Sequence, residues 1–468
     1  MKIFVFAILI IFALSGIVPS FAQTTSPGFT SPVNISNMTS DSQNPNIITS
    51  DDGVFTLWVE NNSGRSDVFF SKSADGGNTF GNPINLSSSN VGQSDYAAFA
   101  QKGNNVYVIW QTSLTGTASV FLAKSSDGGS SFDTPMMISN ATKLAAFPQI
   151  AVSDNHVYFT WLEKSGNDST NIVFEKSDDN GTTIGMPLYL THNLGNSGIP
   201  KLLATGNNVY LTWEDNSKGN FDVFLSKSDD YGASFTLPVD VSNNAGQSGT
   251  PEIVVLQNNV YIVWMDNTSG NYDILFSKST DGGNSFGTPV NVSNLSAASG
   301  YPQFAVTGNN IYVTWTQTIS HPNYDVYFAK STDDGNTFGT PINLSNNVGA
   351  SGWPKIASDG SAIYISWVDN TLGKYNVFIT KSSDGGATFQ NSTNVSNSVT
   401  DSYISNMSTL NNVVYLIWQQ GQQGNHTITF SKSTTFVPEF GPLASIALLI
   451  SIVAIIGISS RSNLRNNL

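Results

Sequence analysis

Short runs of alternating apolar and polar residues follow one another along most of the chain, and the region between the two termini shows no helical periodicity. The runs are bounded by residues that favour turns, such as the Asn-rich sequence Gly308–Asn310. This pattern predicts short antiparallel strands grouped in fours. In one representative unit, the predicted strands are Pro302–Val306, Ile311–Trp315, Asp325–Lys330 and Pro341–Ser345.

The four-strand unit recurs eight times at a spacing of 51 or 52 residues, which indicates a repeat array. Repeats of this length built from short strands predict a β-propeller in which each unit forms one blade. We therefore expect an all-β fold with a single eight-bladed propeller over residues 23–437. A seven-bladed ring with one odd unit is the alternative. The repeat is marked by Trp58, Trp110, Trp161, Trp213, Trp264, Trp315, Trp367 and Trp418, and by Lys72, Lys124, Lys176, Lys227, Lys278, Lys330, Lys381 and Lys432.

Between the third and fourth strands, the units carry Ser-x-Asp-x-Gly-x-x-Phe, as in "SKSTDGGNSFG" from Ser277 to Gly287. The aspartate can accept backbone N–H groups across a tight turn, the glycine tolerates positive φ, and the phenylalanine can pack between blades. The motif resembles the Asp box of sialidases and other bacterial-neuraminidase-repeat proteins. That resemblance implies a structural role on the outer rim of one face. The box residues are Asp75, Asp127, Asp179, Asp230, Asp281, Asp333 and Asp384, and Ile184 replaces the aromatic residue in the copy at Asp179.

The eighth unit lacks a box and a fourth strand, because the chain turns into a different kind of sequence after Lys432. The N-terminal sequence "GFTSPVNIS", Gly28–Ser36, matches "SFGTPVNVS" at Ser285–Ser293. It is expected to add the outer strand to the last blade, beside Thr427–Lys432. Closure of the ring in this way removes two open sheet edges.

Residues 1–22 are predicted to be a signal peptide. Met1 and Lys2 lead into the apolar run Ile3–Val18, and the small residues Ser20 and Ala22 precede the expected cleavage site. We therefore expect the protein to be exported.

Residues 438–468 contain a short motif, an apolar segment and a basic tail, in that order. Pro442–Ser459 is uncharged and just long enough to span a bilayer as a helix, and Arg461 and Arg465 follow it. With "PEFG" directly before the segment, the order resembles the PEFG C-terminal sorting signal of ammonia-oxidising archaea. The resemblance implies a protein anchored in the cell membrane at the cell surface, and a processing enzyme of the archaeosortase type as a partner.

The composition excludes several kinds of function. Only 11% of residues are charged and the net charge is -14, so nucleic acid is not an expected partner. The absence of cysteine excludes disulfides, thiolate nucleophiles and cysteine metal sites. The four histidines lie far apart in the sequence, and no zinc site is predicted.

A largely aromatic set of residues enters the first strands of the blades, where it is expected to lie near the mouth of the central channel. Exposed aromatic rings stack on the apolar faces of sugars or pack on partner proteins. The alternative is that these rings plug the channel as ordinary packing. The candidate ligand-binding residues are Tyr96, Phe147, Tyr301, Trp353 and Tyr403.

Acidic residues flank the loops between second and third strands, on the same face of the predicted propeller. Asp215 with Asp222, and Asp266 with Asp273, are the candidate metal ligands. Carboxylate, Asn and backbone oxygens suit calcium, which is the one cofactor considered. Their repetition in several blades favours the alternative, hydrogen bonds that shape the loops.

The Asp-box resemblance suggests a sialidase-type glycosidase as one hypothesis. In that family three arginines clasp the substrate carboxylate, and a Tyr–Glu pair with an acidic Asp performs the chemistry. This chain has three arginines in all, and two of them follow the predicted membrane segment, so only Arg65 can reach the propeller. The resemblance therefore extends to the fold, and no catalytic residue is assigned.

The preferred hypothesis is a non-catalytic cell-surface propeller that binds glycans, envelope proteins or matrix through its repeated loops. A glycan-active enzyme with two carboxylates is the alternative, and a packing role in an envelope lattice is a third hypothesis. No single unit gains His, Glu and Arg together. Glutamate is scarce within residues 23–437, where it occurs as Glu60, Glu163, Glu175, Glu214 and Glu252.

Fifteen Asn-x-Ser/Thr sequons occur in the chain. Some of them belong to the repeat itself, as in "INLS" and "VNVS". An exported chain with so many acceptors is expected to be a glycoprotein.

Overall fold

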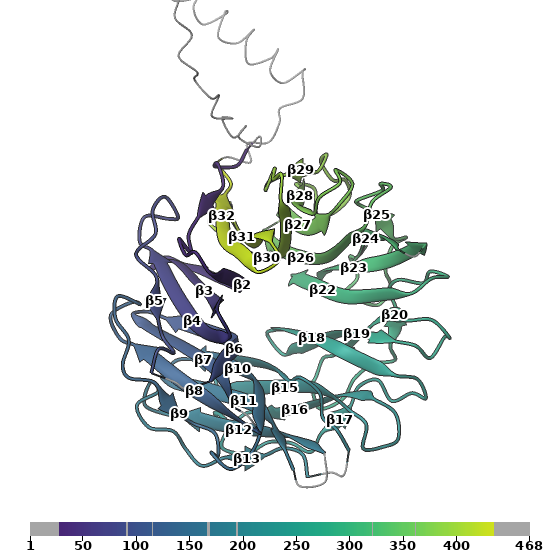
Figure 1. The fold of residues 1–468 in the computed structure, drawn as a ribbon. Coiled ribbons are helices and arrows are strands. Elements are labelled where there is room, and N and C mark those ends of the chain that lie inside the picture. Colours follow the sequence, from purple (N-terminus) through teal and green to yellow (C-terminus); the bar gives the residue numbers. More distant parts are fainter. Residues whose placement is uncertain are drawn as a thin grey trace, which may run out of the picture.

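The computed structural model describes residues 28–434, except 90–91, 115, 166–168, 193–194, 321 and 361. In this part of the chain, eight four-stranded antiparallel sheets are arranged around a common axis (Figure 1). The prediction of an all-β, eight-bladed propeller is confirmed. The seven-bladed alternative is wrong, because every one of the eight units forms a sheet of its own.

The predicted signal peptide, sorting motif and membrane segment lie outside the described residues and stay predictions. Across residues 28–434, with the gaps given above, no helix has the length and apolar character needed to cross a bilayer.

In the first four blades the strands follow the chain from the inside of the ring to its outside. Blade 1 consists of β2 (Asp41–Ser50), β3 (Gly53–Asn62), β4 (Arg65–Ser73) and β5 (Ile84–Asn85); blade 2 of β6 (Gln93–Lys102), β7 (Asn105–Leu114), β8 (Thr117–Ser125) and β9 (Met136–Met137); blade 3 of β10 (Ala145–Ser153), β11 (His156–Lys164), β12 (Thr170–Ser177) and β13 (Leu188–Tyr189); and blade 4 of β14 (Lys201–Thr205), β15 (Asn208–Asp215), β16 (Asp222–Ser228) and β17 (Val239–Asp240).

The remaining blades repeat this order, except that the last blade takes its outer strand from the N-terminus. Blade 5 consists of β18 (Ser248–Leu256), β19 (Asn259–Asp266), β20 (Asp273–Ser279) and β21 (Val290–Asn291); blade 6 of β22 (Ser299–Thr307), β23 (Asn310–Ser320), β24 (Asn323–Ser331) and β25 (Ile342–Asn343); blade 7 of β26 (Ser351–Asp359), β27 (Ala362–Asp369), β28 (Asn376–Ser382) and β29 (Thr393–Asn394); and blade 8 of β30 (Asp401–Leu410), β31 (Val413–Gln422), β32 (Asn425–Lys432) and β1 (Val33–Asn34).

The ring closes where the N-terminal strand pairs with the last blade. Val33 and Asn34 lie opposite Phe430 and Thr429 in antiparallel register, and the Ile35 N–H donates to the Ile428 carbonyl at 2.8 Å. The predicted placement of Phe29–Ser36 beside Thr427–Lys432 is confirmed. Covering the outer edge of β32 with a strand satisfies backbone groups that would otherwise be open to pairing with another chain.

The core lies between the blades. The tryptophan that marks each repeat is almost completely buried. Trp264 of blade 5, for example, belongs to one apolar cluster with Tyr210 and Leu225 of blade 4. Burial of a large apolar side chain contributes about 1.5–3 kcal/mol, so neighbouring blades stabilise one another.

The box turn of blade 5 is held together by one carboxylate. Asp281 Oδ1 accepts hydrogen bonds from the Ser279 hydroxyl at 2.6 Å and from the Ser285 N–H at 3.0 Å, and Oδ2 accepts one from the Ser285 hydroxyl at 2.6 Å. These hydrogen bonds, with that from Ser279 first, hold the pKa of Asp281 well below its usual value. Gly283 has φ +92°, and a Cβ atom there would lie 2.7 Å from Leu225 of blade 4. The turn therefore requires glycine both for its conformation and for the contact between blades.

We expect Asp281→Ala to lower the melting temperature by a few degrees, because four N–H and O–H donors lose their shared acceptor. Thermal unfolding at pH 7 measures the change. Thr280→Ala, at the exposed neighbouring position, is the control and is expected to leave the melting temperature unchanged. Equal melting temperatures for both variants would contradict this account of the turn.

Glu175 on β12 is a buried acid at a repeat position that is otherwise small. Its side chain is 5% exposed. Burial, with a smaller contribution from the charge of Glu163, raises the pKa of Glu175 to about 8. The sister positions in the other seven blades are Ser71, Ala123, Ser226, Ser277, Ala329, Thr380 and Ser431.

We expect Glu175→Gln to stabilise the protein in a pH-dependent way. The folded pKa of about 8 lies above an unfolded value of about 4.3, so this acid favours folding below pH ~4 and loses that contribution as the pH rises to about 8. The variant should therefore unfold at a higher temperature than the wild type at pH 9, and the difference should vanish toward pH 4. Melting curves across this range test the prediction, which a pH-independent difference would refute.

Candidate functional site

The two faces of the propeller carry different structures. The box turns lie beside the hairpin turns between first and second strands, as shown by the hydrogen bond of 3.0 Å from the Gly282 N–H to the Asn258 carbonyl. Because the strands are antiparallel, the connections between blades and the loops between second and third strands lie at the opposite face. The candidate site lies on that opposite face.

Irregular backbone shapes the start of the innermost strands. The register between β18 and β19 shifts between Gly249 and Glu252, and the equivalent shift occurs in β22 and in β26. At these bulges Thr250, Tyr301 and Trp353 have φ angles of +50°, +54° and +52°. A left-handed conformation is costly for such residues, and bulges typically redirect a side chain.

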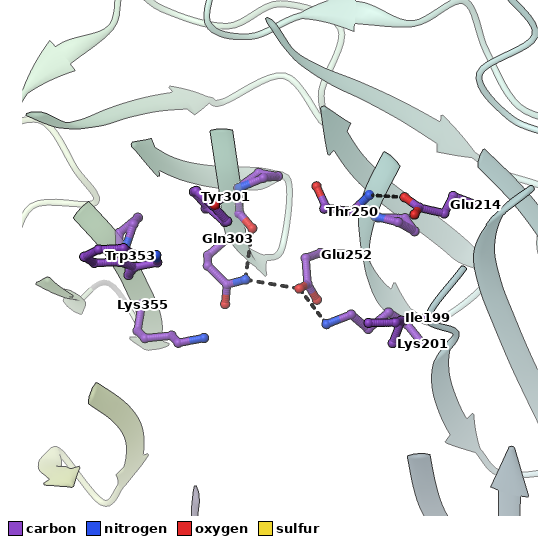
Figure 2. A pocket seen from close by; sticks show the side chains of 12 residues that line it. Ile199, Lys201, Glu214, Thr250, Glu252, Tyr301, Gln303, Trp353 and Lys355 are labelled. Atoms are coloured by element: carbon purple, nitrogen blue, oxygen red, sulfur yellow. Dashed lines mark hydrogen bonds and ion pairs between the residues drawn. The ribbon is translucent and has the colours of Figure 1, made fainter. Parts of the chain in front are cut away.

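The bulges of blades 5, 6 and 7, together with residues of blade 4, enclose a cavity of about 290 Å³ (Figure 2). Its side chains come from equivalent positions in successive blades. The lining residues are Ile199, Lys201, Glu214, Thr250, Pro251, Glu252, Tyr301, Pro302, Gln303, Trp353, Pro354 and Lys355. The cavity is therefore a product of the ring, and no single repeat contains it.

Two aromatic rings border the cavity. The side chains of Tyr301 and Trp353 are 57% and 52% exposed. These two rings are open to solvent, whereas Phe147 and Tyr403 of the same set are only partly exposed. An aromatic surface that is open to solvent beside a cavity can accept the apolar face of a sugar.

The polar side of the cavity is formed by the ion pair between Lys201 and Glu252 and by a second lysine, Lys355. Glu252 Oε1 accepts hydrogen bonds from Lys201 Nζ at 2.7 Å and from Gln303 Nε2 at 3.2 Å (Figure 2). Burial lowers the pKa of Lys355, which the charge of Glu252 partly opposes. The arrangement offers a carboxylate oxygen, an amide and an ammonium group to a polar ligand.

Glu214 reaches the same cavity from β15, where it follows the blade tryptophan. Its Oε2 accepts a hydrogen bond from the Thr250 N–H at 2.9 Å (Figure 2). A Cβ atom on Gly198 or on Gly249 would lie 2.3 Å from the Glu214 side chain, so two glycines form a narrow slot for it. Burial raises the pKa of Glu214, and the hydrogen bond from Thr250 opposes that shift.

A second cavity of about 530 Å³ continues from the first toward blade 8. Trp353 and Lys355 line both cavities, and Tyr403, Gln419 and His426 line the second. His426 Nδ1 lies 2.5 Å from Asp41 Oδ1 across the ring closure, which fixes the imidazole. The two cavities share the side chains of Trp353 and Lys355, and together we call them the groove.

The remaining aromatic candidates lie apart from the first cavity. Tyr96 and Phe147 contact each other, with ring centroids 4.5 Å apart, on blades 2 and 3. Tyr403 packs against Tyr375 at 5.4 Å. Tyr301 and Trp353 thus share the first cavity, and Trp353 and Tyr403 share the second. Tyr96 and Phe147 lie together on blades 2 and 3 and line neither of these two cavities. Their role in ligand binding stays a prediction.

The acidic candidates are brought together in pairs. Asp215 lies opposite Asp222, and Asp266 opposite Asp273, in the strand register. Each carboxylate accepts protein donors, for example the Ser197 hydroxyl to Asp215 at 2.7 Å. Among the described residues, no group of three or more acidic or histidine side chains is placed to hold a metal ion. The calcium hypothesis stays a prediction.

Sequence reasoning missed Lys201, Glu214, Glu252, Gln303 and Lys355 as site residues. A signal existed for four of them, because a polar residue follows the bulge proline in "SGIPK", "SGTPE", "SGYPQ" and "SGWPK". For Glu214 the signal was weaker. It is the one acid among the residues that directly follow the repeat tryptophans.

The comparisons with known proteins support the fold. No protein-family model and no curated protein matches the sequence. Two solved polysaccharide lyases are similar in structure: one with a TM-score of 0.50 at 10% identity, over 72% of this chain and 89% of that one, and one described as an ulvan lyase with a TM-score of 0.50 at 10% identity, over 71% and 90%. A Trypanosoma rangeli sialidase gives a TM-score of 0.38 at 12% identity, over 64% of this chain and 55% of that one. At 10% identity, the likeness to the two lyases shows a shared β-propeller fold.

Proposed function

We propose that the protein is a cell-surface propeller of the Asp-box type that binds a saccharide at the mouth of its channel. The observation that carries the proposal is the pair of half-exposed rings, Tyr301 and Trp353, on the border of a cavity with a polar side. An aromatic wall and a few convergent polar groups are what a saccharide site requires. The solved lyases with this fold act on polysaccharides, which agrees with the proposal.

Arg65 gives no support to a sialidase mechanism. Its guanidinium pairs with Asp67 at 3.0 Å and donates to the Ser88 carbonyl at 2.9 Å, within blade 1. A three-arginine clasp for a carboxylate has no other member in residues 23–437. We therefore propose a saccharide site that depends on aromatic rings, amides and lysine.

A glycan array that includes neutral and anionic oligosaccharides tests this function with the purified protein. Binding to a defined set of glycans, followed by a saturable titration in solution, is the expected result. If the folded protein binds none of the arrayed glycans, the proposal fails.

Export and anchoring are part of the proposal. Residues 1–22 have the features of a signal peptide, and residues 438–468 have the features of a membrane-anchored sorting signal of the archaeal type. Fractionation of the native cells should place the chain in the membrane fraction, with its propeller accessible to added protease from outside. Recovery from the cytosol would contradict it.

A further inference from the structure

We infer that Glu214 and Glu252 form a carboxyl pair that hydrolyses a glycosidic bond of a saccharide bound at the channel mouth. This inference rests on the proposed saccharide site and gives that site a reaction. The sequence alone does not indicate this pair, because the two glutamates belong to neighbouring blades and no single repeat contains both.

Both carboxyl groups line the first cavity, and their surroundings are opposite in character. Glu252 Oε1 accepts hydrogen bonds from the Lys201 ammonium group and from the Gln303 amide. Its Oε2 receives no hydrogen bond from the residues that the structure describes. A carboxylate with one oxygen fixed and one open to a cavity is suited to accept a proton from water.

Glu214 has the complementary setting. It occupies the slot between Gly198 and Gly249, and within the described part of the chain no lysine, arginine or histidine pairs with it. Burial without a cation favours the protonated acid, which is the form that donates a proton to a leaving group. Two carboxyl groups on one cavity, one paired with a cation and one buried without a cation, can serve as the base and the acid of a glycoside hydrolysis.

The fold itself does not require an acid at the position of Glu214. The residue that corresponds to Glu214 is Gln111 in blade 2, where Oε1 accepts the Phe147 N–H at 3.3 Å. In blade 6 it is Thr316, whose hydroxyl accepts the Trp353 N–H at 3.1 Å. A neutral acceptor therefore fulfils the same structural role in two sister blades, so the hydrogen bond to the bulge does not require a carboxyl group at position 214.

The reaction is a hydrolysis with water as the second reactant. The Glu214 proton passes to the glycosidic oxygen as the bond between that oxygen and the anomeric carbon breaks. The water oxygen bonds to the anomeric carbon, and its proton passes to Glu252. A proton then returns through solvent from Glu252 to Glu214, which restores both groups. Tyr301 and Trp353 hold the sugar rings during these steps.

The test follows the cleavage of array-positive oligosaccharides by the full chain, with product analysis by chromatography. We expect the wild type to cleave at least one of them. Glu214→Gln and Glu252→Gln should each lower kcat about 100-fold or more while changing Kd by less than about threefold. In Glu214→Gln the alkaline limb of the pH–rate profile should also disappear, which a merely structural role would not cause.

Matched controls are Gln111→Ala and Gln149→Ala, which change the same two repeat positions in blades 2 and 3. Both should leave kcat unchanged. Binding without cleavage by the wild type would overturn the hydrolysis and leave the saccharide site standing. Cleavage that survives both glutamate substitutions would overturn the assignment of the pair. Absence of binding to any glycan would overturn the proposed function and, with it, this inference.

Discussion

Trp353→Gly is expected to weaken saccharide binding at least about tenfold and to leave the stability of the propeller nearly unchanged. The Trp353 side chain lines both cavities and is half exposed, so its loss removes the wall that the two cavities share. The backbone at this position has φ +52°, a conformation that glycine adopts without strain. Relief of about 1 kcal/mol of strain offsets the apolar contacts that are lost. Isothermal titration and thermal unfolding measure the two effects.

The control for this experiment is Tyr96→Gly. Tyr96 is the equivalent bulge residue of blade 2, with φ +49° and 50% exposure, and it is not among the described residues that line either cavity. It should leave the affinity unchanged. Equal weakening by both substitutions would show that binding does not depend on the groove in particular. Unchanged affinity in Trp353→Gly would show that the saccharide does not bind in the groove.

Ile35→Asp is expected to destabilise the protein by at least about 4 kcal/mol, because it places an unpaired charge in the apolar cluster that closes the ring. Ile35 is 4% exposed and packs with Ile47 and Trp58 of blade 1 and with Ile428 of blade 8. It is therefore the side chain through which the N-terminal strand joins the first and last blades. Urea denaturation, followed by tryptophan fluorescence, gives the free energy of unfolding.

Val33→Asp provides the matched control on the same strand. Val33 is 50% exposed and lies opposite Phe430 in the backbone register. We expect its effect to stay within about 0.5 kcal/mol. If both substitutions cost the same, or if Ile35→Asp costs nothing, the N-terminal strand does not close the ring in solution.

The fold could be predicted because the same pattern of four strands occurs in every repeat. The spacing of the tryptophans and lysines defines the blades, and the match of Gly28–Ser36 to a fourth strand predicts the closure that β1 makes. The predicted ends of the strands were less accurate than the predicted order of the blades. The second strand of blade 6 was expected over Ile311–Trp315, whereas β23 runs from Asn310 to Ser320. Its pairing continues to Ser320 opposite Asn323 of β24, past the apolar alternation on which the prediction relied.

The site could be predicted only in part, for two physical reasons. The aromatic residues near the channel were visible because they recur at one repeat position, but which of them share a cavity depends on the order of blades around the ring. The contact between Lys201 and Glu252 joins residues one full repeat apart, and a comparison of blades one by one does not reveal it. The left-handed conformation of Trp353, directly before a proline, runs against the local preference of the chain.

The most direct test of the central claim is a crystal structure of the protein with an array-positive oligosaccharide. The account predicts a sugar ring stacked on Trp353 and Tyr301, with its hydroxyl groups within hydrogen-bonding distance of Glu252 and Gln303. Sugar bound at the box turns or along the outer strands, with the groove at the channel mouth empty, would contradict it.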